Sequence, residues 1–106
     1  TMSTHLDFNQ FKDVLGFDWD AGNLNKNLVK HEVSWQECEE SFRNRPIILA
    51  KDFKHSGLEE RYTLYGRTDQ NRKLTIIFTL RRNYFRIISA RDQNKKERSV
   101  YEKQKA

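Results

Sequence analysis

The sequence lacks most of the features that mark disulfide-rich, membrane-bound or cofactor-binding proteins. Cys38 is the only cysteine, which excludes an internal disulfide and a zinc site built from several cysteines. No stretch approaches the ~18 apolar residues of a membrane span, and the N-terminus lacks the basic-then-apolar pattern of a signal peptide. We therefore expect a cytoplasmic protein that does not enter a membrane.

Motifs for nucleotides and metals are also missing. There is no glycine-rich phosphate loop, no paired carboxylate motif, no spacing typical of metal ligands and no internal repeat. This argues against a cofactor-dependent enzyme, and we predict neither a cofactor nor a metal ion. The 106 residues fit a single domain, residues 1–106, that is large enough to bury a core without disulfides.

Positive charge is concentrated toward the C-terminus. The net charge is +5, but residues 1–42 hold 3 Lys or Arg against 8 Asp or Glu, whereas residues 72–106 hold 11 against 3. A basic region attracts polyanions through its long-range field. The distribution favours nucleic acid or another polyanion as ligand, although a basic surface that only promotes solubility would give the same pattern.

Three consecutive antiparallel strands are predicted between residues 59 and 91, most simply as a meander. Apolar and polar residues alternate there, and the short links at residues 68–72 and 81–83 contain the Asn and Asp typical of hairpins. The alternation predicts an apolar face and a face that carries arginines. The apolar face comprises Tyr62, Leu64, Leu74, Ile76, Phe78, Leu80, Phe85 and Ile87, and the other Arg61, Thr63, Tyr65, Arg67, Thr75, Thr79, Arg81, Tyr84 and Arg86.

A strand and a helix are predicted before the meander, in residues 13–32. Residues 13–19 are rich in apolar residues and indicate a strand, and Asp20 can cap a helix that ends near Glu32. One face of this helix carries three residues at i, i+4 and i+7: Leu24, Leu28 and His31. Residues 1–12 show no clear period and are expected to form a lead-in or a short helix.

A second helix begins at Ser34. Ser34 and Glu37 have the spacing of a capping box, with Val33 and Cys38 placed for a hydrophobic staple. Its inner face is predicted to carry Trp35, Cys38 and Phe42. Cys38 is therefore expected to be a small buried hydrophobe. Pro46 ends the helix, and residues 47–50 indicate a short strand.

The remaining segments are a loop and a C-terminal helix. Residues 51–59 are polar, and His55 with Ser56 there lacks the third member that a nucleophile pair needs. After residue 91, Asn94 and Glu97 can form a second capping box. The elements together predict an α+β fold with two N-terminal helices, an antiparallel sheet built on the three-strand meander, and a C-terminal helix.

Several short fragments stand in a specific order and spacing. They are Phe17-x-Trp19-Asp20, Asn27-x-x-Lys30-His31-x-Val33-Ser34-Trp35-x-Glu37, Glu60-Arg61, Gly66-Arg67-Thr68, Ile77-Phe78-Thr79, Arg86-Ile87-Ile88-Ser89-Ala90-Arg91, Lys96-Glu97-Arg98 and Tyr101-Glu102. Through them, residues 17–102 resemble the BrnT family of toxins. Residues 1–16 form an N-terminal extension that the resemblance does not cover.

The resemblance implies a RelE-like fold and an endoribonuclease toxin of a bacterial type II toxin-antitoxin system, which cleaves RNA without a metal ion and so inhibits translation and growth. The implied partners are the RNA substrate and a BrnA-type antitoxin, and DNA would be contacted only indirectly, through that antitoxin. Two positions depart from the family pattern, which usually has Lys at Asn23 and Gly at Glu32.

Metal-free RNA cleavage needs a base, an acid and cations that stabilise charge on the phosphate. Arginine suits the last task because its fork grips phosphate through two hydrogen bonds. The candidate catalytic residues are Lys30, His31, Glu60, Arg67 and Arg86, and the candidate substrate-binding residues are Thr79, Arg81, Arg91 and Tyr101. Arg91 has the parity of the apolar face, but a bulge or twist at the strand end would turn it toward the arginines.

A non-catalytic module that holds nucleic acid or an acidic protein on the same basic face is the alternative. The Asn23 departure favours the module, whereas the retained Arg67, Thr79, Arg86 and Arg91 favour the enzyme. In either case we expect an antitoxin to reach the basic face and the C-terminal helix, residues 94–105, with Val100 and Tyr101 as a small apolar anchor.

Overall fold

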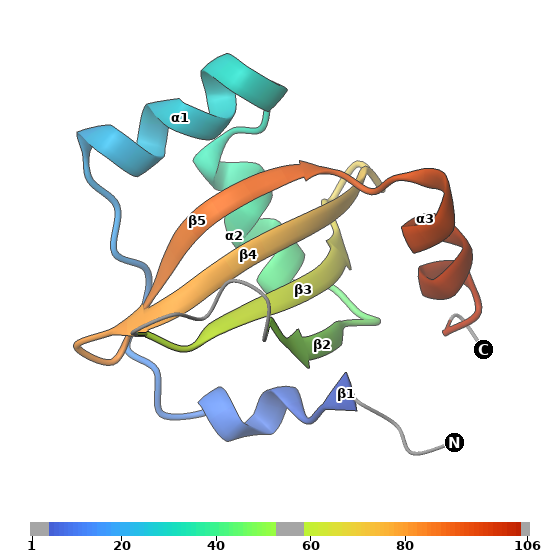
Figure 1. The fold of residues 1–106 in the computed structure, drawn as a ribbon, viewed down its shortest axis with the longest axis horizontal. Helices are drawn as coiled ribbons and strands as arrows, with labels where there is room; N and C mark the ends of the chain where they lie inside the picture. The colour runs from blue at the N-terminus through green and yellow to red at the C-terminus, as the bar shows by residue number, and fades with distance from the viewer. Residues whose placement is uncertain (1–4, 53–58, 105–106) are drawn as a thin grey trace.

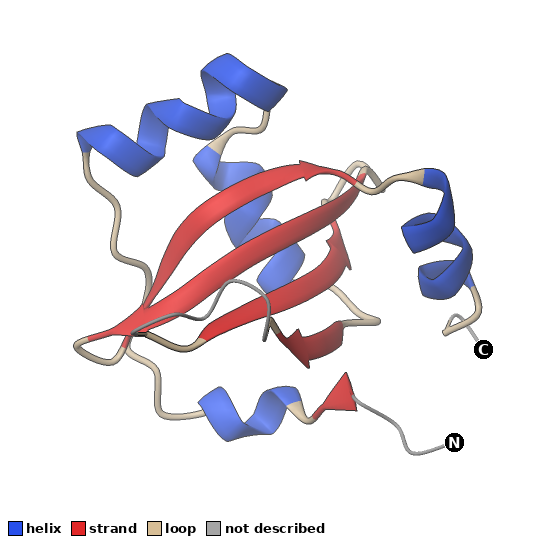
Figure 2. Cartoon of the chain, in the orientation of Figure 1, coloured by secondary structure: helices blue, strands red, loops and turns tan. Residues whose placement is uncertain are grey.

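Five antiparallel strands form one sheet in chain order (Figures 1 and 2). The computed structural model describes residues 5–52 and 59–104. The strands are β1 (His5–Leu6), β2 (Ile48–Lys51), β3 (Arg61–Arg67), β4 (Lys73–Arg81) and β5 (Tyr84–Asp92). Helices α1 (Ala21–His31), α2 (Trp35–Arg43) and α3 (Lys95–Glu102) and a 3-10 helix, η1 (Phe8–Phe11), complete the fold. The predicted α+β class is confirmed, while its RelE-like character stays a prediction.

Helices α2 and α3 begin as the sequence predicts, each with a complete capping box. The Ser34 hydroxyl accepts the Glu37 N–H at 3.2 Å, and the Asn94 side chain accepts the Glu97 N–H at 2.8 Å. Such reciprocal caps satisfy backbone donors that the first helical turn leaves free. One detail of the α2 prediction is wrong. The buried face of α2 consists of Cys38, Ser41 and Phe42, and Trp35, at the margin of that face, is 42% exposed.

The predicted strand at residues 13–19 is also wrong. This segment lies beside the start of β5 and forms a single parallel bridge, between Phe17 and Phe85. The Phe85 N–H donates to the Gly16 carbonyl at 2.9 Å, and the Asp18 N–H donates to the Phe85 carbonyl at 2.8 Å. The segment meets only the first residues of β5 before the chain turns into α1, so no longer ladder forms.

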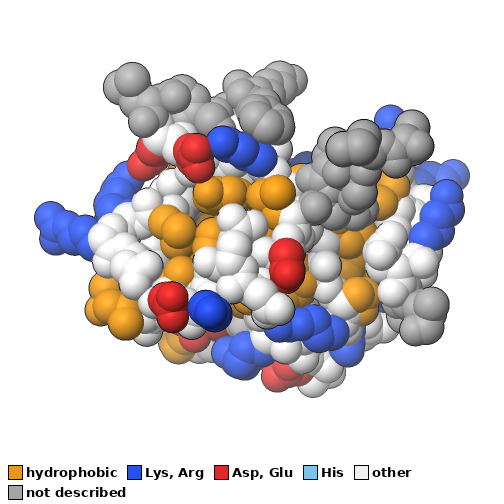
Figure 3. Space-filling model, turned by 90° about the horizontal axis from the view of Figure 1, so that it is seen from below, with side chains coloured by type: hydrophobic (Ala, Val, Ile, Leu, Met, Phe, Trp, Pro, Cys, Tyr) orange, Lys and Arg blue, Asp and Glu red, His pale blue; other side chains and the backbone are white. Residues whose placement is uncertain are grey.

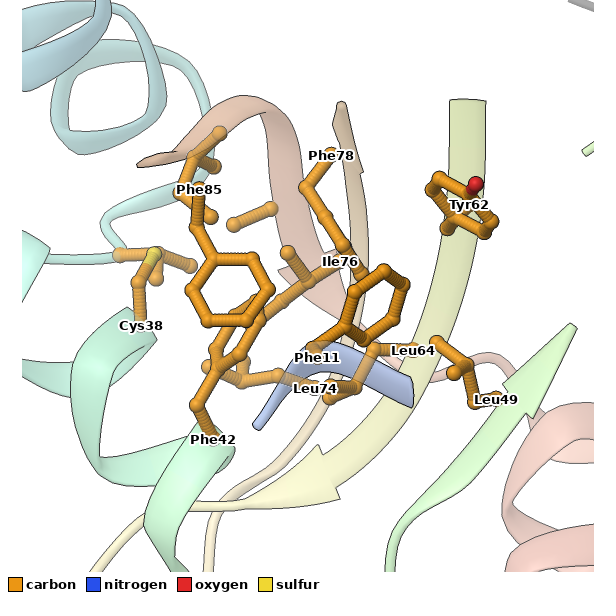
Figure 4. Close-up of a cluster of buried hydrophobic side chains, with 13 residues drawn as sticks. Phe11, Cys38, Phe42, Leu49, Tyr62, Leu64, Leu74, Ile76, Phe78 and Phe85 are labelled. Carbon is orange, nitrogen blue, oxygen red and sulfur yellow. The ribbon is translucent and has the colours of Figure 1, made fainter. Parts of the chain in front are cut away.

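One face of the sheet, which we call the core face, packs against α2 and η1 (Figure 4). Its side chains include the predicted apolar set, of which Leu80 is only partly buried. Gly66 lies where α2 crosses β3, and a Cβ there would stand 2.8 Å from the Ser41 carbonyl oxygen. Only glycine permits this close approach. In Figure 1, α2 lies behind the sheet, so the reader faces the opposite side, the outer face.

The N-terminal extension is part of the core. β1 pairs with β2, and Phe11 in η1 is 6% exposed. The Phe11 ring makes edge contacts with Tyr62, Phe78 and Phe85, with ring centroids 5.2 to 5.7 Å apart. A short helix in residues 1–12 is one of the two expectations, and η1 agrees with it. The packing of η1 into the core is not predicted by the sequence.

A β-bulge in β5 decides which side chains reach the outer face. Ile77 pairs with Ser89 while Phe78 pairs with Ile87, so Ile88 is the extra residue. A bulge of this kind shifts the alternation by one position. It places Arg91 on the same face as Arg86, as predicted for a bulge, although this bulge lies in the middle of β5 and not at its end.

Helix α1 lies along the open edge of β5 and is held there by two buried asparagines. The Ala90 N–H donates to Asn27 Oδ1 at 3.0 Å, and Asn23 Nδ2 donates to the Ile87 carbonyl at 3.4 Å. Asn23 also accepts the Asp20 N–H at 2.7 Å. The residue that departs from the family pattern thus joins α1 to β5. No helix in residues 5–52 and 59–104 combines the length and apolar character that crossing a bilayer requires.

Candidate nucleic-acid interface

The outer face carries a row of three register partners from three strands. Arg61 of β3 pairs with Thr79 of β4, and Thr79 pairs with Arg86 of β5. The Thr79 hydroxyl is buried and donates to the Glu60 carbonyl at 2.7 Å. Two arginines therefore flank a fixed threonine on a rigid sheet, as the strand alternation predicts.

Two open hollows lie beside this row, the first at Arg61 and Arg86 and the second at Arg61. The first, about 390 Å³, is lined by Gly22, Asn23, Lys26, Glu59, Arg61, Arg81, Arg86, Ile87 and Ile88. The second, about 310 Å³, is lined by Arg61, Ile77, Ile88, Ser89 and Arg91. Because they share Arg61 and Ile88, they form one concave surface. We call its five cations, Lys26, Arg61, Arg81, Arg86 and Arg91, the basic strip.

Acidic partners hold Arg86 and Arg81 in place. Arg86 lies 2.9 Å from Asp20 and 3.5 Å from Asp18. Arg81 lies 3.3 Å from Glu59. The hydrogen bond from the Asn23 N–H, followed by that from Arg86, lowers the pKa of Asp20. The acidic N-terminal third of the sequence thus supplies the two carboxylates that orient Arg86, in the basic C-terminal third.

Arg91 is held at the end of the strip by α3. Its two terminal nitrogens lie 2.8 and 2.9 Å from the two carboxylate oxygens of Glu97. This two-point bond, above all other causes, lowers the pKa of Glu97 to about 2. The Thr75 hydroxyl donates to the same carboxylate at 2.9 Å. Helix α3 therefore closes one end of the outer face, at Arg91.

Glu60, a candidate catalytic residue, has its carboxylate away from this row. It accepts from Lys51 at 2.8 Å and from the Tyr62 hydroxyl at 3.0 Å. Lys51 pairs with Tyr62 in the sheet, so both belong to the core-face side. The hydrogen bond from Lys51 is the main cause that lowers the pKa of Glu60. Only the Glu60 backbone, through Thr79, contributes to the outer face.

Lys30 and His31 lie at the C-terminal end of α1, beyond the part that lines the hollows. Lys30 is exposed and stands one helical turn after Lys26. The His31 carbonyl accepts from Arg72 Nη2 at 3.2 Å, and Arg72 lies 2.7 Å from Asp92 at the end of β5. The structure therefore does not bring His31 together with the Arg61, Thr79 and Arg86 row.

Arg67 and Tyr101 also lie apart from the row. Arg67 is at the far end of β3, where its Nε donates to the Arg45 carbonyl at 2.9 Å. Tyr101 is fully buried, and its hydroxyl donates to the Pro46 carbonyl at 2.7 Å. The assignment of Tyr101 to substrate binding, and to an apolar anchor for a partner, stays a prediction, and the burial of its ring does not favour it: the Tyr101 hydroxyl joins α3 to the segment before β2.

The sequence interpretation missed two residues of the site. The sequence pattern does not single out Lys26, and it places Glu59 in the polar loop of residues 51–59. Glu59 has the same parity as Arg61, so extending the strand alternation by one step toward the N-terminus would have indicated it. Lys26 can be assigned to the site only when the position of α1 along β5 is known. That position depends on the contacts that Asn23 and Asn27 make with β5.

Other candidate chemistry is absent from the described part of the chain or lies outside it. Within residues 5–52 and 59–104, no three His, Cys, Asp or Glu side chains group as metal ligands would. His55 and Ser56 lie outside the described residues. Cys38 is 1% exposed, and burial raises the pKa of its thiol to about 12, so it is not a nucleophile.

The side of the molecule formed around η1 and β1 has a different character (Figure 3). There, apolar side chains occupy the middle of the surface, and Lys or Arg side chains are interspersed with acidic ones. The arginines that share one concave surface are those of the outer face.

Comparison with known proteins and the basic surface both indicate a nucleic acid as ligand. No individually curated protein matches the sequence. The model of one protein family, described as the ribonuclease toxin BrnT of type II toxin-antitoxin systems, matches residues 19–97. This span includes α1, α2, the sheet from β2 to β5 and the start of α3, and it leaves the N-terminal extension outside. Since the match covers most of the chain, the protein belongs to the BrnT family of ribonuclease toxins of type II toxin-antitoxin systems.

Proposed function

We propose that this chain is a metal-independent endoribonuclease that acts in the bacterial cytoplasm, and that it cleaves RNA over the row of Arg61, Thr79 and Arg86. The observation that carries this proposal is the convergence of five cations and one carboxylate, Glu59, on a single concave surface. RNA cleavage by such a toxin would inhibit translation and growth.

The reaction that suits these residues uses the substrate's own 2′-hydroxyl. The 2′ oxygen forms a bond to the adjacent phosphorus while the bond from phosphorus to the 5′ oxygen breaks, which leaves a 2′,3′-cyclic phosphate and a 5′-hydroxyl. Arg86 and Arg61 hold the phosphate oxygens as negative charge develops on them. Preorganised donors of this kind typically contribute about 10²- to 10³-fold each.

We assign the two proton transfers to residues that line the first hollow. Glu59 accepts the proton of the 2′-hydroxyl, and Lys26 donates a proton to the leaving 5′ oxygen. Lys30, one turn further along α1, is the alternative donor if the RNA lies closer to Arg91. Glu59 replaces Glu60 as the proposed base because Glu59 lines the first hollow, where it lies 3.3 Å from Arg81, whereas the carboxylate of Glu60 is bound to Lys51 and Tyr62 away from the row.

Cleavage in the presence of a chelator tests the activity. The purified protein should cleave single-stranded RNA in EDTA and leave a cyclic phosphate at the new 3′ end. Binding of RNA without cleavage would instead support the non-catalytic module. Cleavage that requires an added divalent cation would contradict metal independence.

Two neighbouring glutamates provide a matched pair for the assignment of the base. Glu59→Gln should lower the cleavage rate by about 10²-fold or more, in the range of positioned acid-base groups. Glu60→Gln removes the same charge one residue away and should leave the rate within a factor of a few. Equal effects of the two substitutions would contradict the role of Glu59.

We also propose that a BrnA-type antitoxin inhibits the protein by covering the basic strip, so that DNA is reached only through the antitoxin. Reversing two charges of the strip, Arg81→Glu with Arg86→Glu, should weaken RNA binding and antitoxin binding together. Association with the antitoxin should also slow between low and physiological salt, since complementary charge mainly accelerates encounter. Unchanged antitoxin affinity in the double variant would place the antitoxin elsewhere, most simply on the N-terminal helices.

A further inference from the structure

A third hollow lies beside the basic strip, at the tip of the β4–β5 hairpin. It has a volume of about 260 Å³ and is lined by Phe17, Asp18, Trp19, Arg81, Arg82 and Tyr84. Drug-sized ligands occupy pockets of ~300–1,000 Å³. The hollow is thus of a size for one ring system of a larger ligand.

Three of its six lining side chains are aromatic. Tyr84, in the first position of β5, is 38% exposed. The rings of Phe17 and Trp19 lie nearly parallel, 11° apart, with centroids separated by 6.2 Å. Aromatic faces of this kind stack on flat ligands, and a base on an aromatic side chain typically contributes ~1–3 kcal/mol.

The walls are fixed before any ligand arrives. The Phe17 segment is bonded to the start of β5 by the Asp18 and Phe85 N–H groups described above, and the Leu15 N–H donates to the Asn83 carbonyl at 3.0 Å. The Trp19 indole N–H donates to Glu39 at 2.8 Å, which sets the orientation of its ring. Preorganised walls lower the entropic cost of binding.

The hairpin turn adds positive charge at the rim. Arg82 and Asn83 have φ values of 53° and 67°, the pattern of a tight two-residue turn, and Arg82 is exposed. Arg81 lines both this hollow and the first hollow, which contains Arg61 and Arg86. Arg81 therefore connects the basic strip to the aromatic hollow, and the two carboxylates along this path, Asp18 and Glu59, lie within 3.5 Å of Arg86 and Arg81.

We propose that this hollow binds one unpaired nucleobase of the RNA, next to the phosphate that is cleaved, with the base stacked against Tyr84 and Trp19 and a neighbouring phosphate on Arg82. The aromatic walls and the arginine rim match the two parts of a nucleotide, its flat base and its charged phosphate. The inference rests on the proposed function, because it extends the RNA path beyond Arg86.

The first test measures binding of a short single-stranded RNA whose 2′ positions are methylated, so that it cannot be cleaved. Tyr84→Ala should weaken its affinity by roughly 5- to 150-fold, the range that corresponds to loss of one stacked base. Tyr84→Phe keeps the ring and should bind like the wild type. Trp35→Ala is the matched control, because Trp35 is an aromatic residue 42% exposed that does not line the hollow.

The second test removes single bases from the RNA. For the wild type, an abasic site at one position should weaken binding about as much as Tyr84→Ala does. In the Tyr84→Ala variant, the same abasic site should have no further effect. This non-additive result is the signature of direct contact between that base and the hollow.

The outcomes separate this inference from the proposed function. If Tyr84→Ala binds and cleaves RNA like the wild type, the base-binding inference is overturned while the ribonuclease proposal stands. If Tyr84→Ala loses only antitoxin binding, the hollow is a protein contact and the inference is again wrong. If the wild type neither binds nor cleaves RNA, the proposed function fails and the inference with it.

Discussion

Arg86 Nη2 lies 2.9 Å from Asp20 Oδ2, and this ion pair connects β5 to the start of α1. The other oxygen of Asp20 accepts the Asn23 N–H at 3.0 Å and caps the helix. One carboxylate thus positions both the helix that carries Lys26 and the arginine at the centre of the basic strip. Asp20 acts through Arg86 and is a positioning residue.

Asp20→Asn should separate the positioning of Arg86 from the binding of RNA. An asparagine retains the oxygen that caps α1, but it no longer holds Arg86 by charge. We expect kcat to fall several-fold, because Arg86 is no longer held in position. KM for RNA should stay constant or decrease, because the substitution removes a negative charge beside the basic strip. Asp13→Asn, an equal charge change outside the strip, should alter neither constant. Unchanged kcat in Asp20→Asn would show that Arg86 needs no such positioning.

Acid should destabilise the protein through Glu97. Its pKa in the folded state is about 2, against an ordinary value of 4.5, and its side chain is 14% exposed. Because the folded pKa is the lower one, the stabilisation is complete above about pH 4.5 and is lost as the pH falls toward 2. The shift corresponds to about 3 kcal/mol of unfolding free energy.

Urea unfolding at a series of pH values measures this contribution. Glu97→Gln should lower the free energy of unfolding at pH 7 and flatten its decline between about pH 5 and 2. Glu102→Gln on the same helix is the matched control, because its ion pair with Lys73 is longer, 3.5 Å, and its side chain is 45% exposed. Parallel curves for the wild type and Glu97→Gln would contradict the role of the Arg91–Glu97 pair.

Phe11 should contribute strongly to stability although it lies outside the span that matches the family. Its ring is 6% exposed and contacts three core aromatics. Phe11→Ala should reduce the free energy of unfolding by about 3–5 kcal/mol, as large-to-small core substitutions of Phe do. Leu15→Ala, in the same N-terminal extension but 69% exposed, should change it by less than about 0.5 kcal/mol. Equal effects would mean that the extension is not part of the core.

The sequence predicts well where local signals are strong. Capping boxes at Ser34 and Asn94 begin the helices that they indicate, because such a cap depends on residues three apart in the chain. The alternation in residues 61–87 likewise predicts which apolar side chains face the core, since one face of the sheet must leave water. The arginines of the outer face follow from the same alternation.

The sequence predicts poorly where contacts between distant segments decide the outcome. Phe8 and Phe11 show no period of their own, and their burial depends on a core assembled from β3, β4 and β5. Glu59 and Glu60 are adjacent and chemically alike, and only the path of β3 separates the first hollow from the contact with Lys51. Lys26 joins the site because Asn23 and Asn27 fix α1 beside β5.

The most direct test of the central claim, that the outer face cleaves RNA, compares Arg86 with an arginine elsewhere under single-turnover conditions in EDTA. Arg86→Ala should lower the cleavage rate by about 10²- to 10³-fold, and Arg86→Lys should recover only part of it, because lysine keeps the charge but not the fork. Arg43→Ala is the matched control, since Arg43 is exposed at the end of α2 and does not line the hollows. We expect Arg43→Ala to cleave RNA at a rate close to that of the wild type, with all three variants folded by circular dichroism. Equal cleavage rates for Arg86→Ala and Arg43→Ala would contradict the central claim.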